Sequence, residues 1–281
     1  MSAAVSAAVI RERSGTGPYP YLAENRPRPP PEGGATLSAV DALPATGECH
    51  LWSVPVRTRP EWEALLPPDE AARAAAMPRG VRRDLLVTSR AAQRLVAHRY
   101  TGRPARGVRI ERACARCGAG HGRPRVLHGG YDYSVTHTRR RVLIAVVTEG
   151  RVGIDLDTSP YPGVLRRLIA RITTPGERAA LSRLPARELP EAFTRLWSRK
   201  EAVVKLTGHG LAARLDRIEV RGDLARPVGS PAEDWPAFPI HLRDAPVEGD
   251  RIAAIASTRR ITALAPRSLS APAATGTTRS A

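Results

Sequence analysis

Only two of the chain's 44 basic Lys and Arg residues are lysines, Lys200 and Lys205, and they flank Glu201 in the segment LWSRKEAVVKLTGHG at residues 196–210. A lysine is a compact point charge that can give up a proton, which an arginine effectively cannot do. A site that holds a phosphate and protonates a departing one could need such a group. The segment therefore indicates phosphoryl chemistry. The alternative is a surface ion pair between Glu201 and Lys205, for which a chain so rich in arginine would be expected to use arginine.

Two aspartates occupy alternate positions of an apolar segment, VGIDLDT, at residues 152–158. In a β-strand this spacing puts Gly153, Asp155 and Asp157 on one face and the apolar residues on the other. The two carboxylates would lie about 6.5 Å apart and could share a divalent cation, because hard oxygen ligands suit such ions. The alternative is a solvated strand end at which Asp157 caps the following turn.

Two further segments offer candidate phosphate contacts. In YSVTHT, at residues 133–138, Thr136 and His137 could hydrogen-bond a phosphate or an adenine ring, although a histidine in a strand is more often structural. The segment GAGHGRPRV, at residues 118–126, offers backbone N–H groups and two arginines, which is typical of a phosphate-binding loop. It has neither the Gly-Lys-Ser/Thr of a Walker A loop nor the strand-to-helix context of a dinucleotide fingerprint.

The segment CARCGAGH favours a different kind of site. Cys114, Cys117 and His121 could supply part of a zinc site, with Cys49 or His50 as a candidate fourth ligand. A single Cys-x-x-Cys pair is much less specific than two such pairs, so zinc binding stays an alternative at this point.

The chain is strongly basic, with a net charge of +17 over 281 residues. Such a charge attracts phosphates, nucleic acids, anionic membranes or acidic proteins. A nucleic-acid-binding protein is the main rival class, but aromatic residues are only 4% and the arginines are spread along the whole chain. The sequence shows no membrane-spanning stretch, no basic secretory n-region and no disulfide scaffold among its three cysteines. We therefore expect a soluble, cytoplasmic protein.

Hydrophobic periodicity predicts an α+β protein of two similar lobes, each with helices and a small antiparallel sheet. The lobes are expected at residues 47–149 and 150–263, between a disordered leader at 1–46 and a disordered tail at 264–281. The clearest helices are 82–102 and Leu189–Thr207, each followed or ended by glycine. On the first helix the pattern predicts an apolar stripe of Leu85, Leu86, Ser89, Ala92, Leu95 and Val96. Strands are expected at 50–56, 107–112, 133–147, 151–158, 215–222, 238–244 and 250–258.

The segments GIDLD at 153–157 and WSRKEAVVKLTGHGL at 197–211, together with SVTHT, resemble the surfactin-type 4′-phosphopantetheinyl transferases. RITTPGE is similar to that family's Thr-Glu turn, and GRP at 122–124 to its Gly-Lys-Pro element. The likeness covers about residues 50–260. It implies two lobes related by a pseudo-twofold, with coenzyme A and Mg²⁺ at their junction. The implied reaction is that of a holo-[acyl-carrier-protein] synthase. It moves phosphopantetheine from coenzyme A to a serine of an apo acyl or peptidyl carrier protein and releases adenosine 3′,5′-bisphosphate.

The resemblance also implies roles for particular residues. Asp155, Asp157 and Glu201 would bind the metal, and Glu201 would act as the base for the incoming serine hydroxyl. Lys200 and Lys205 would contact the phosphates, with Lys205 at the leaving group. Asp155, Glu201 and Lys205 are thus the implied catalytic residues. Contacts to coenzyme A are implied for Arg90, Arg94, Gly122, Arg123, Pro124, Thr136 and His137.

The sequence departs from the family's pattern at three places. Asp157 stands where glutamate is commoner, Arg123 replaces a lysine, and threonines replace both serines of the Ser-His-Ser element. The charge is preserved at Asp157 and at Arg123, and the hydroxyl groups are preserved at the two threonines. The implied partner is an acidic carrier protein, which suits a basic chain, and the implied state is a monomer. Fatty-acid, polyketide and nonribosomal-peptide pathways are equally open. A non-catalytic relative that only binds carrier proteins is a further rival, against which the intact catalytic residues argue.

Overall fold

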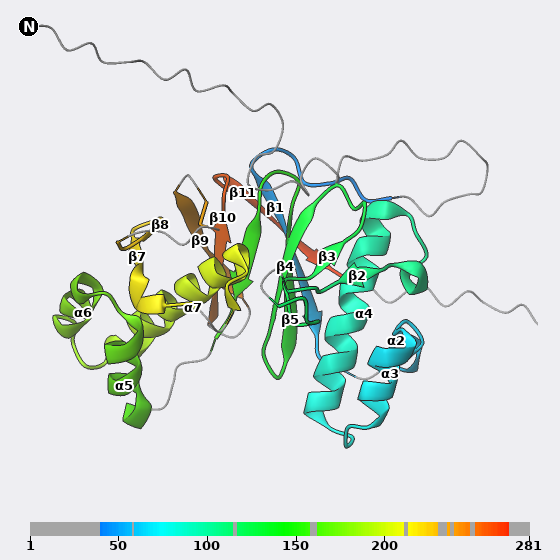
Figure 1. Cartoon of the computed structure of the whole chain (residues 1–281), viewed down its shortest axis with the longest axis horizontal. Helices are drawn as coiled ribbons and strands as arrows, with labels where there is room; N and C mark the ends of the chain where they lie inside the picture. The colour runs from blue at the N-terminus through cyan, green and yellow to red at the C-terminus, as the bar shows by residue number, and fades with distance from the viewer. Residues whose placement is uncertain are drawn as a thin grey trace, which may run out of the picture.

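The computed structural model describes residues 40–57, 59–114, 117–157, 162–210, 213–229, 235–236, 239–247 and 251–269. They form two lobes that lie side by side, with helices on the outer sides and two sheets between them (Figure 1). Most of the expected leader and the part of the expected tail from residue 270 onward lie outside the described residues. No helix in the described ranges is both long and apolar enough to span a membrane.

The first lobe is a four-stranded sheet covered by helices on its outer face. The strand order is β11-β1-β5-β4, with β1 and β11 parallel and the other neighbours antiparallel. The apolar side chains of α4 pack against Trp52, Val54 and Ile144 of the sheet. The elements are β1 (Glu48–Pro55), α2 (Pro60–Glu63), α3 (Pro68–Ala75), α4 (Val81–Thr101), η1 (Ala105–Gly107), β2 (Ile110–Glu111), β3 (Arg125–Val126), β4 (Asp132–His137), β5 (Arg141–Val147) and β11 (Ala263–Ser268).

The second lobe is a five-stranded antiparallel sheet, in the order β6-β10-β9-β8-β7, with α7 on its outer face. A capping box between Thr174 and Glu177 begins α6, and Gly208 ends α7 in the left-handed conformation (φ 83°). The elements are β6 (Val152–Asp155), α5 (Pro162–Ile172), α6 (Pro175–Ser182), α7 (Leu189–Thr207), η3 (Leu215–Arg217), β7 (Ile218–Arg221), β8 (Leu224–Pro227), β9 (Ile240–Val247) and β10 (Arg251–Ser257).

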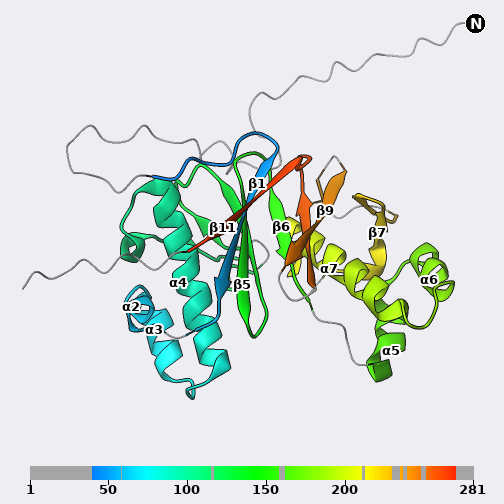
Figure 2. The same cartoon turned by 180° about the vertical axis from the view of Figure 1, so that it is seen from behind.

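The two sheets lie next to each other in the middle of the molecule (Figures 1 and 2) and share an apolar core. They join along one edge, where β4 contacts β6. The hydrogen bonds between β4 and β6 run from backbone N–H groups of residues 152–156 to side-chain oxygens of alternate β4 residues, instead of to backbone carbonyl groups. The N–H groups of Val152, Ile154 and Leu156 donate to Asp132 (2.7 Å), Ser134 (3.1 Å) and Thr136 (3.3 Å), respectively. In each of these three bonds the donor residue lies 20 positions after the acceptor residue, so β4 and β6 run in the same direction. Polar side chains of the first lobe thus fix the position of β6.

The predicted α+β class is confirmed, and the expected helices at 82–102 and Leu189–Thr207 are α4 and α7. The pseudo-twofold stays a prediction. The apolar members of the expected stripe on α4 face the core of the first lobe: Ala92 and Val96 are buried in it, and Leu85, Leu86 and Leu95 pack against it. Leu85 and Leu86, with Ser89, also line a cavity. A stripe of apolar residues does not by itself show that one end of it borders a cavity.

The expected tail from residue 264 was wrong at its start, because β11 (Ala263–Ser268) is a strand of the first lobe. The chain therefore returns to the first lobe after the second is complete, and the first sheet is mixed rather than antiparallel. The strand carries Pro266, which cannot donate a backbone hydrogen bond and is tolerated because β11 is an edge strand. Its proline and scarce large apolar residues concealed it in the sequence.

Candidate active site

Gly153 allows β6 to lie directly against α7. A Cβ atom at this position would overlap the carbonyl oxygen of Ala202 and approach the Leu206 nitrogen to 2.7 Å. No side chain fits there, so glycine is required for the close approach of strand and helix. Two residues later on the same face, Asp155 is brought to the side of α7 that carries Glu201 and Lys205. The predicted alternation of β6 is confirmed, since Val152 and Ile154 lie in the core between the sheets.

Asp155 and Lys205 form the centre of the site. The ammonium group of Lys205 lies 2.7 Å from Asp155 Oδ1, and the Thr136 hydroxyl donates to the same oxygen at 3.3 Å. The second carboxylate oxygen, Oδ2, is buried and has no hydrogen-bond partner among the described residues. A buried carboxylate oxygen without a donor is costly unless a ligand satisfies it. The arrangement thus leaves one oxygen of Asp155 for a bound group.

Glu201 stands one helical turn from Lys205 on α7 and is influenced by both aspartates. Burial raises the pKa of Glu201, and the negative charges of Asp155 and Asp157 raise it further, while Lys205 opposes the effect. Three carboxylates close enough to influence one another repel, and a cation between them would reverse that repulsion.

Two cavities meet at this point of the lobe junction. The smaller, of about 610 Å³, is lined by Asp155 and Asp157 of the second lobe and by α4 and β4 of the first. The larger, of about 790 Å³, is lined by α7, including Glu201, and by the segment that follows β2. Lys205 lines both cavities. A substrate that filled both would therefore pass over the Asp155–Lys205 pair.

Comparisons with known proteins agree on one family. The sequence profile of the 4′-phosphopantetheinyl transferase superfamily matches residues 151–255, which include all three carboxylates and both lysines. The 4′-phosphopantetheinyl transferase HetI of Nostoc sp. (strain PCC 7120) is 30% identical over 182 residues, which are 62% of this chain and 73% of that protein. A Synechocystis sp. (strain PCC 6803) protein provisionally named as such a transferase is 34% identical over 95 residues, 34% of this chain and 38% of its own length. The chain belongs to the 4′-phosphopantetheinyl transferase superfamily.

Binding of a divalent metal ion by Asp155, Asp157 and Glu201 stays a prediction, because in the described part of the chain these carboxylates do not form a group of ligand atoms that all lie within 4.8 Å of one another. Asp155, Asp157 and Glu201 offer hard oxygen ligands, which Mg²⁺ prefers, and Asp155 contributes a buried oxygen that lacks a donor. Asp157 is exposed at the mouth of the smaller cavity.

Several residues expected to bind coenzyme A line the cavities of the transferase. Partial burial lowers the pKa of His137, and the positive charge of Lys205 lowers it further, so its ring is a neutral hydrogen-bonding group at neutral pH. Thr136, His137 and Arg90 line the smaller cavity, and Gly122, Arg123 and Pro124 line the larger one.

Lys200 does not lie where the sequence placed it. Its ammonium group is fully buried on the opposite side of α7, 2.5 Å from Glu177 and within 2.9 Å of the carbonyl oxygens of Ile172 and Leu215. All three of its donors are used, so the expected contact with phosphates was wrong. Positions 200 and 205 are separated by about 140° around a helix, whereas 201 and 205 are separated by about 40°. That spacing was available in the sequence.

The arginines expected at the substrate also differ from the prediction. Arg94 is 3% exposed, lines neither cavity, and pairs with Glu70 at 2.8 Å, so its expected role in binding coenzyme A was wrong. Arg123 borders the larger cavity, but its guanidinium donates to Asp132, to the Val152 carbonyl and to the Lys205 carbonyl (3.2 Å). Arg123 thus links the first lobe to both β6 and α7. Its positive charge is balanced by the carboxylate of Asp132.

The sequence did not single out Arg73 and Arg82, which line the smaller cavity beside Arg90 and Lys205. Nothing in the local pattern separates them from the other arginines of the chain. Asp132 and Ser134, which hold β6, were also missed. Their alternation with Tyr133 and Val135 in a strand indicates one polar face, and that signal was present in the sequence.

Proposed function

We propose that the chain is a surfactin-type transferase. It would move 4′-phosphopantetheine from coenzyme A to a serine of an apo acyl or peptidyl carrier protein and release adenosine 3′,5′-bisphosphate in a Mg²⁺-dependent reaction. The observation that carries the proposal is the Asp155–Lys205 pair, with its unpartnered buried oxygen, at the meeting point of two cavities. Superfamily membership supports the type of group transferred.

The reaction requires a proton acceptor and a positive charge in defined places. The serine oxygen forms a bond to the phosphorus atom that carries the pantetheine arm, and the bond from that phosphorus to the bridging oxygen breaks. Glu201 takes the serine proton, a role that its raised pKa favours over that of an ordinary carboxylate. Lys205 faces both cavities and stabilises the charge on the departing phosphate. A bound Mg²⁺ ion would neutralise pyrophosphate charge and orient the reacting groups.

The smaller cavity suits the anionic end of coenzyme A. Arg73, Arg82 and Arg90 supply positive charge, and His137 supplies a neutral ring that can hydrogen-bond. The net charge of +17 would favour encounter with an acidic carrier protein. We further expect a monomer, because one chain supplies the side chains of both cavities.

The proposal is tested by incubating the full chain with coenzyme A, Mg²⁺ and apo carrier proteins of the acyl and peptidyl types. We expect the intact mass of at least one carrier to rise by one phosphopantetheine group, and no rise when its acceptor serine is replaced by alanine. Omission of Mg²⁺ with added chelator should abolish the rise. No mass gain on any carrier would refute the proposed function.

A further inference from the structure

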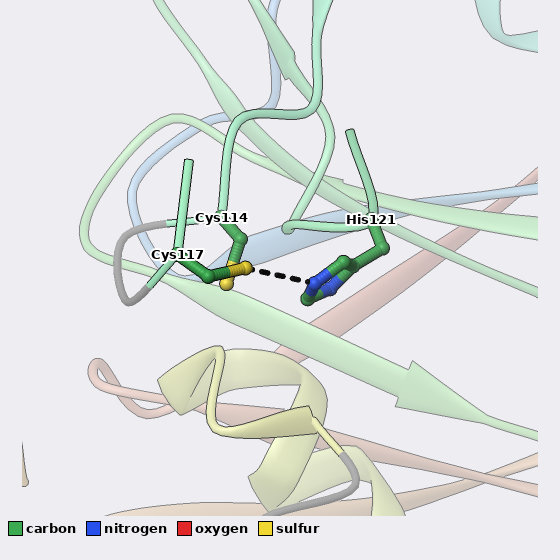
Figure 3. A group of neighbouring side chains, drawn as sticks. All are labelled: Cys114, Cys117 and His121. Atoms are coloured by element: carbon green, nitrogen blue, oxygen red, sulfur yellow. Dashed lines mark hydrogen bonds between the residues drawn. The ribbon is translucent and has the colours of Figure 1, made fainter. Parts of the chain in front are cut away.

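Outside the active site, three potential metal ligands gather in the segment between β2 and β3. One ligand atom each of Cys114, Cys117 and His121 lies within 4.8 Å of the other two. The Cys117 Sγ atom is 3.1 Å from His121 Nε2. Figure 3 shows the three side chains pointing toward one another from different parts of the loop. We call these residues the loop cluster.

The separations in the loop cluster are those that a zinc ion would need after small side-chain rotations. With Zn–S near 2.3 Å and Zn–N near 2.0–2.1 Å, tetrahedral angles put two sulfurs about 3.8 Å apart and a sulfur and a nitrogen about 3.6 Å apart. The Cys117 Sγ–His121 Nε2 distance of 3.1 Å is slightly shorter than the second value, and all three ligand atoms lie within 4.8 Å of one another. The ligands are also of the type that zinc prefers, because thiolates and imidazole are soft or borderline donors.

The backbone of the loop is folded to bring the ligands together. The Cys114 N–H donates to the Ala119 carbonyl, and the Gly118 N–H donates back to the Cys114 carbonyl, both at 2.8 Å. Gly118 has a φ of 73°, a left-handed conformation that glycine adopts without strain. The His121 N–H donates to Ala119 at 2.9 Å, which turns the imidazole back toward the sulfurs. The loop therefore closes on itself at the positions of the ligands.

Packing of apolar side chains does not hold this loop. Residues 117–121 are exposed, and the described apolar cores include none of them. Small exposed loops without a core are commonly held by metals or disulfides. Gly122, which directly follows the cluster, lies against the backbone of Ala113. A Cβ atom at Gly122 would overlap the Ala113 carbonyl oxygen. This second contact fixes the end of the loop next to the larger cavity.

We propose that Cys114, Cys117 and His121 bind one Zn²⁺ ion, with water as the fourth ligand, and that this ion fastens the loop whose following residues border the larger cavity. The two thiols give up their protons as the ion binds, so about two protons are released per ion. The imidazole binds through Nε2 as a neutral ring. Two thiolates balance the charge of the ion.

The third cysteine of the chain is not part of the site, which corrects the earlier candidate for a fourth ligand. Cys49 is fully buried in the core between the sheets, and burial raises the pKa of its thiol to about 12, which opposes thiolate formation. His50, the other candidate, hydrogen-bonds the Tyr100 hydroxyl at 2.7 Å within the first lobe. Cys49 therefore provides a natural control for the two loop cysteines.

The proposed ion is distinct from the one expected at the active site. Asp155, Asp157 and Glu201 are hard oxygen donors, whereas the loop cluster has sulfur and nitrogen. His121 of the loop cluster and Glu201 of the active site both line the larger cavity. The ion would act on substrate binding indirectly, by holding Gly122, Arg123 and Pro124 in place.

The test measures metal content without coenzyme A or carrier protein, so its result is independent of the proposed transfer reaction. The full chain is purified under reducing conditions without chelator, supplied with Zn²⁺, passed through a desalting column and analysed by elemental mass spectrometry. We expect one zinc per chain. Replacement of zinc by Co²⁺ should give the near-ultraviolet charge-transfer absorption of a cobalt–thiolate bond.

Matched variants distinguish the loop cluster from other thiols and imidazoles. Cys114→Ser, Cys117→Ser and His121→Ala should each lose stoichiometric zinc, and the two cysteine variants should lose most of the cobalt–thiolate absorption. Cys49→Ala and His128→Asn, the latter changing a nearby exposed histidine, should keep one ion per chain. Thermal unfolding of each variant shows whether it is folded, and His121→Ala changes only an exposed side chain.

Three results would overturn the proposal: a wild-type chain without stoichiometric zinc, a Cys117→Ser variant that keeps it, or a Cys49→Ala variant that loses it. A Cys114–Cys117 disulfide under the same reducing conditions, seen as a mass about 2 Da lower, would also overturn it. As a second readout, chelation should accelerate tryptic cleavage within 112–125, and re-added Zn²⁺ should slow it again. Unchanged cleavage would exclude the proposed fastening role.

Discussion

The two lysines of the chain have different environments although they stand in one short segment. Lys205 is partly exposed between the cavities and pairs with Asp155, whereas Lys200 is fully buried and pairs with Glu177. Burial lowers the pKa of Lys200, and its hydrogen bond and ion pair with Glu177 oppose the shift. One lysine is thus available for chemistry and the other stabilises the second lobe.

Substitution should separate these two roles. We expect Lys205→Ala to lower kcat at least about a hundredfold while the unfolding temperature changes little. Lys205→Arg should recover substrate binding better than rate. Lys200→Ala leaves a buried carboxylate without its partner and should destabilise folding by about 3–5 kcal/mol. Steady-state kinetics and urea unfolding measure the two effects. A stable, slow Lys200→Ala enzyme would contradict this assignment.

A buried histidine should make stability depend on pH. Burial lowers the pKa of His50 below its ordinary value of 6.5, and the charge of Arg267 lowers it further, while Glu48 and Asp41 oppose the shift. The unfolded chain therefore takes up a proton below about pH 6.5 that the folded chain does not.

The free energy of unfolding should fall as the pH decreases from 6.5 toward 5, by up to about 1.4 kcal/mol per pH unit. His50→Gln should reduce this slope, and between pH 7 and 8 the slopes of the two proteins should coincide. Urea unfolding across that range provides the measurement. Equal slopes below pH 6.5 would show that His50 is not the responsible group.

At the scale of elements, the site depends on the distance between β6 and α7. Gly153 removes the side chain that would separate them, and Arg123 ties both elements to β4 through Asp132. Asp155 reaches Lys205 because a strand edge and a helix are in backbone contact.

We expect Gly153→Ala to destabilise the protein by about 1–3 kcal/mol, since the new methyl group meets backbone atoms that cannot move independently. It should also lower kcat, because Asp155 would move away from Lys205. Gly176→Ala is the control: its nearest neighbour would be a glutamate oxygen of Glu219 at 3.8 Å, and alanine is favoured in a helix. Thermal unfolding and kinetics test both. Equal stability of the two variants would refute the requirement for glycine at position 153.

At the scale of the whole molecule, the chain closes the first lobe last. β11 pairs with β1 over Glu48–Ala263 to Ser53–Ser268, so the first sheet is complete only after the second lobe has been made. Figure 2 shows β11 lying against β1, far along the chain from it. Stability of the first lobe should therefore depend on residues at the other end of the sequence.

A chain ended at Thr262 tests this dependence, with a chain ended at Leu269 as its matched control. Loss of β11 removes the ladder to β1 and the contact of Arg267 with His50, and each lost hydrogen bond is worth about 1 kcal/mol. We expect the shorter chain to unfold at a clearly lower urea concentration than the control. Coincident transitions would mean that β11 contributes nothing to the lobe.

Much of the site followed from the sequence because its pattern is local. Alternation fixed the face of β6 that carries Asp155, although the strand ends there and Asp157 lies beyond it. Four-residue spacing put Glu201 beside Lys205, since strand and helix periods depend only on the backbone. The same helical period would have separated Lys200 from them. The tertiary structure alone decided the buried partner of Lys200, the use of Arg123 and Arg94 in internal ion pairs, and the return of β11 to β1. These depend on contacts between residues distant in the chain, where no periodicity indicates which charged group meets which.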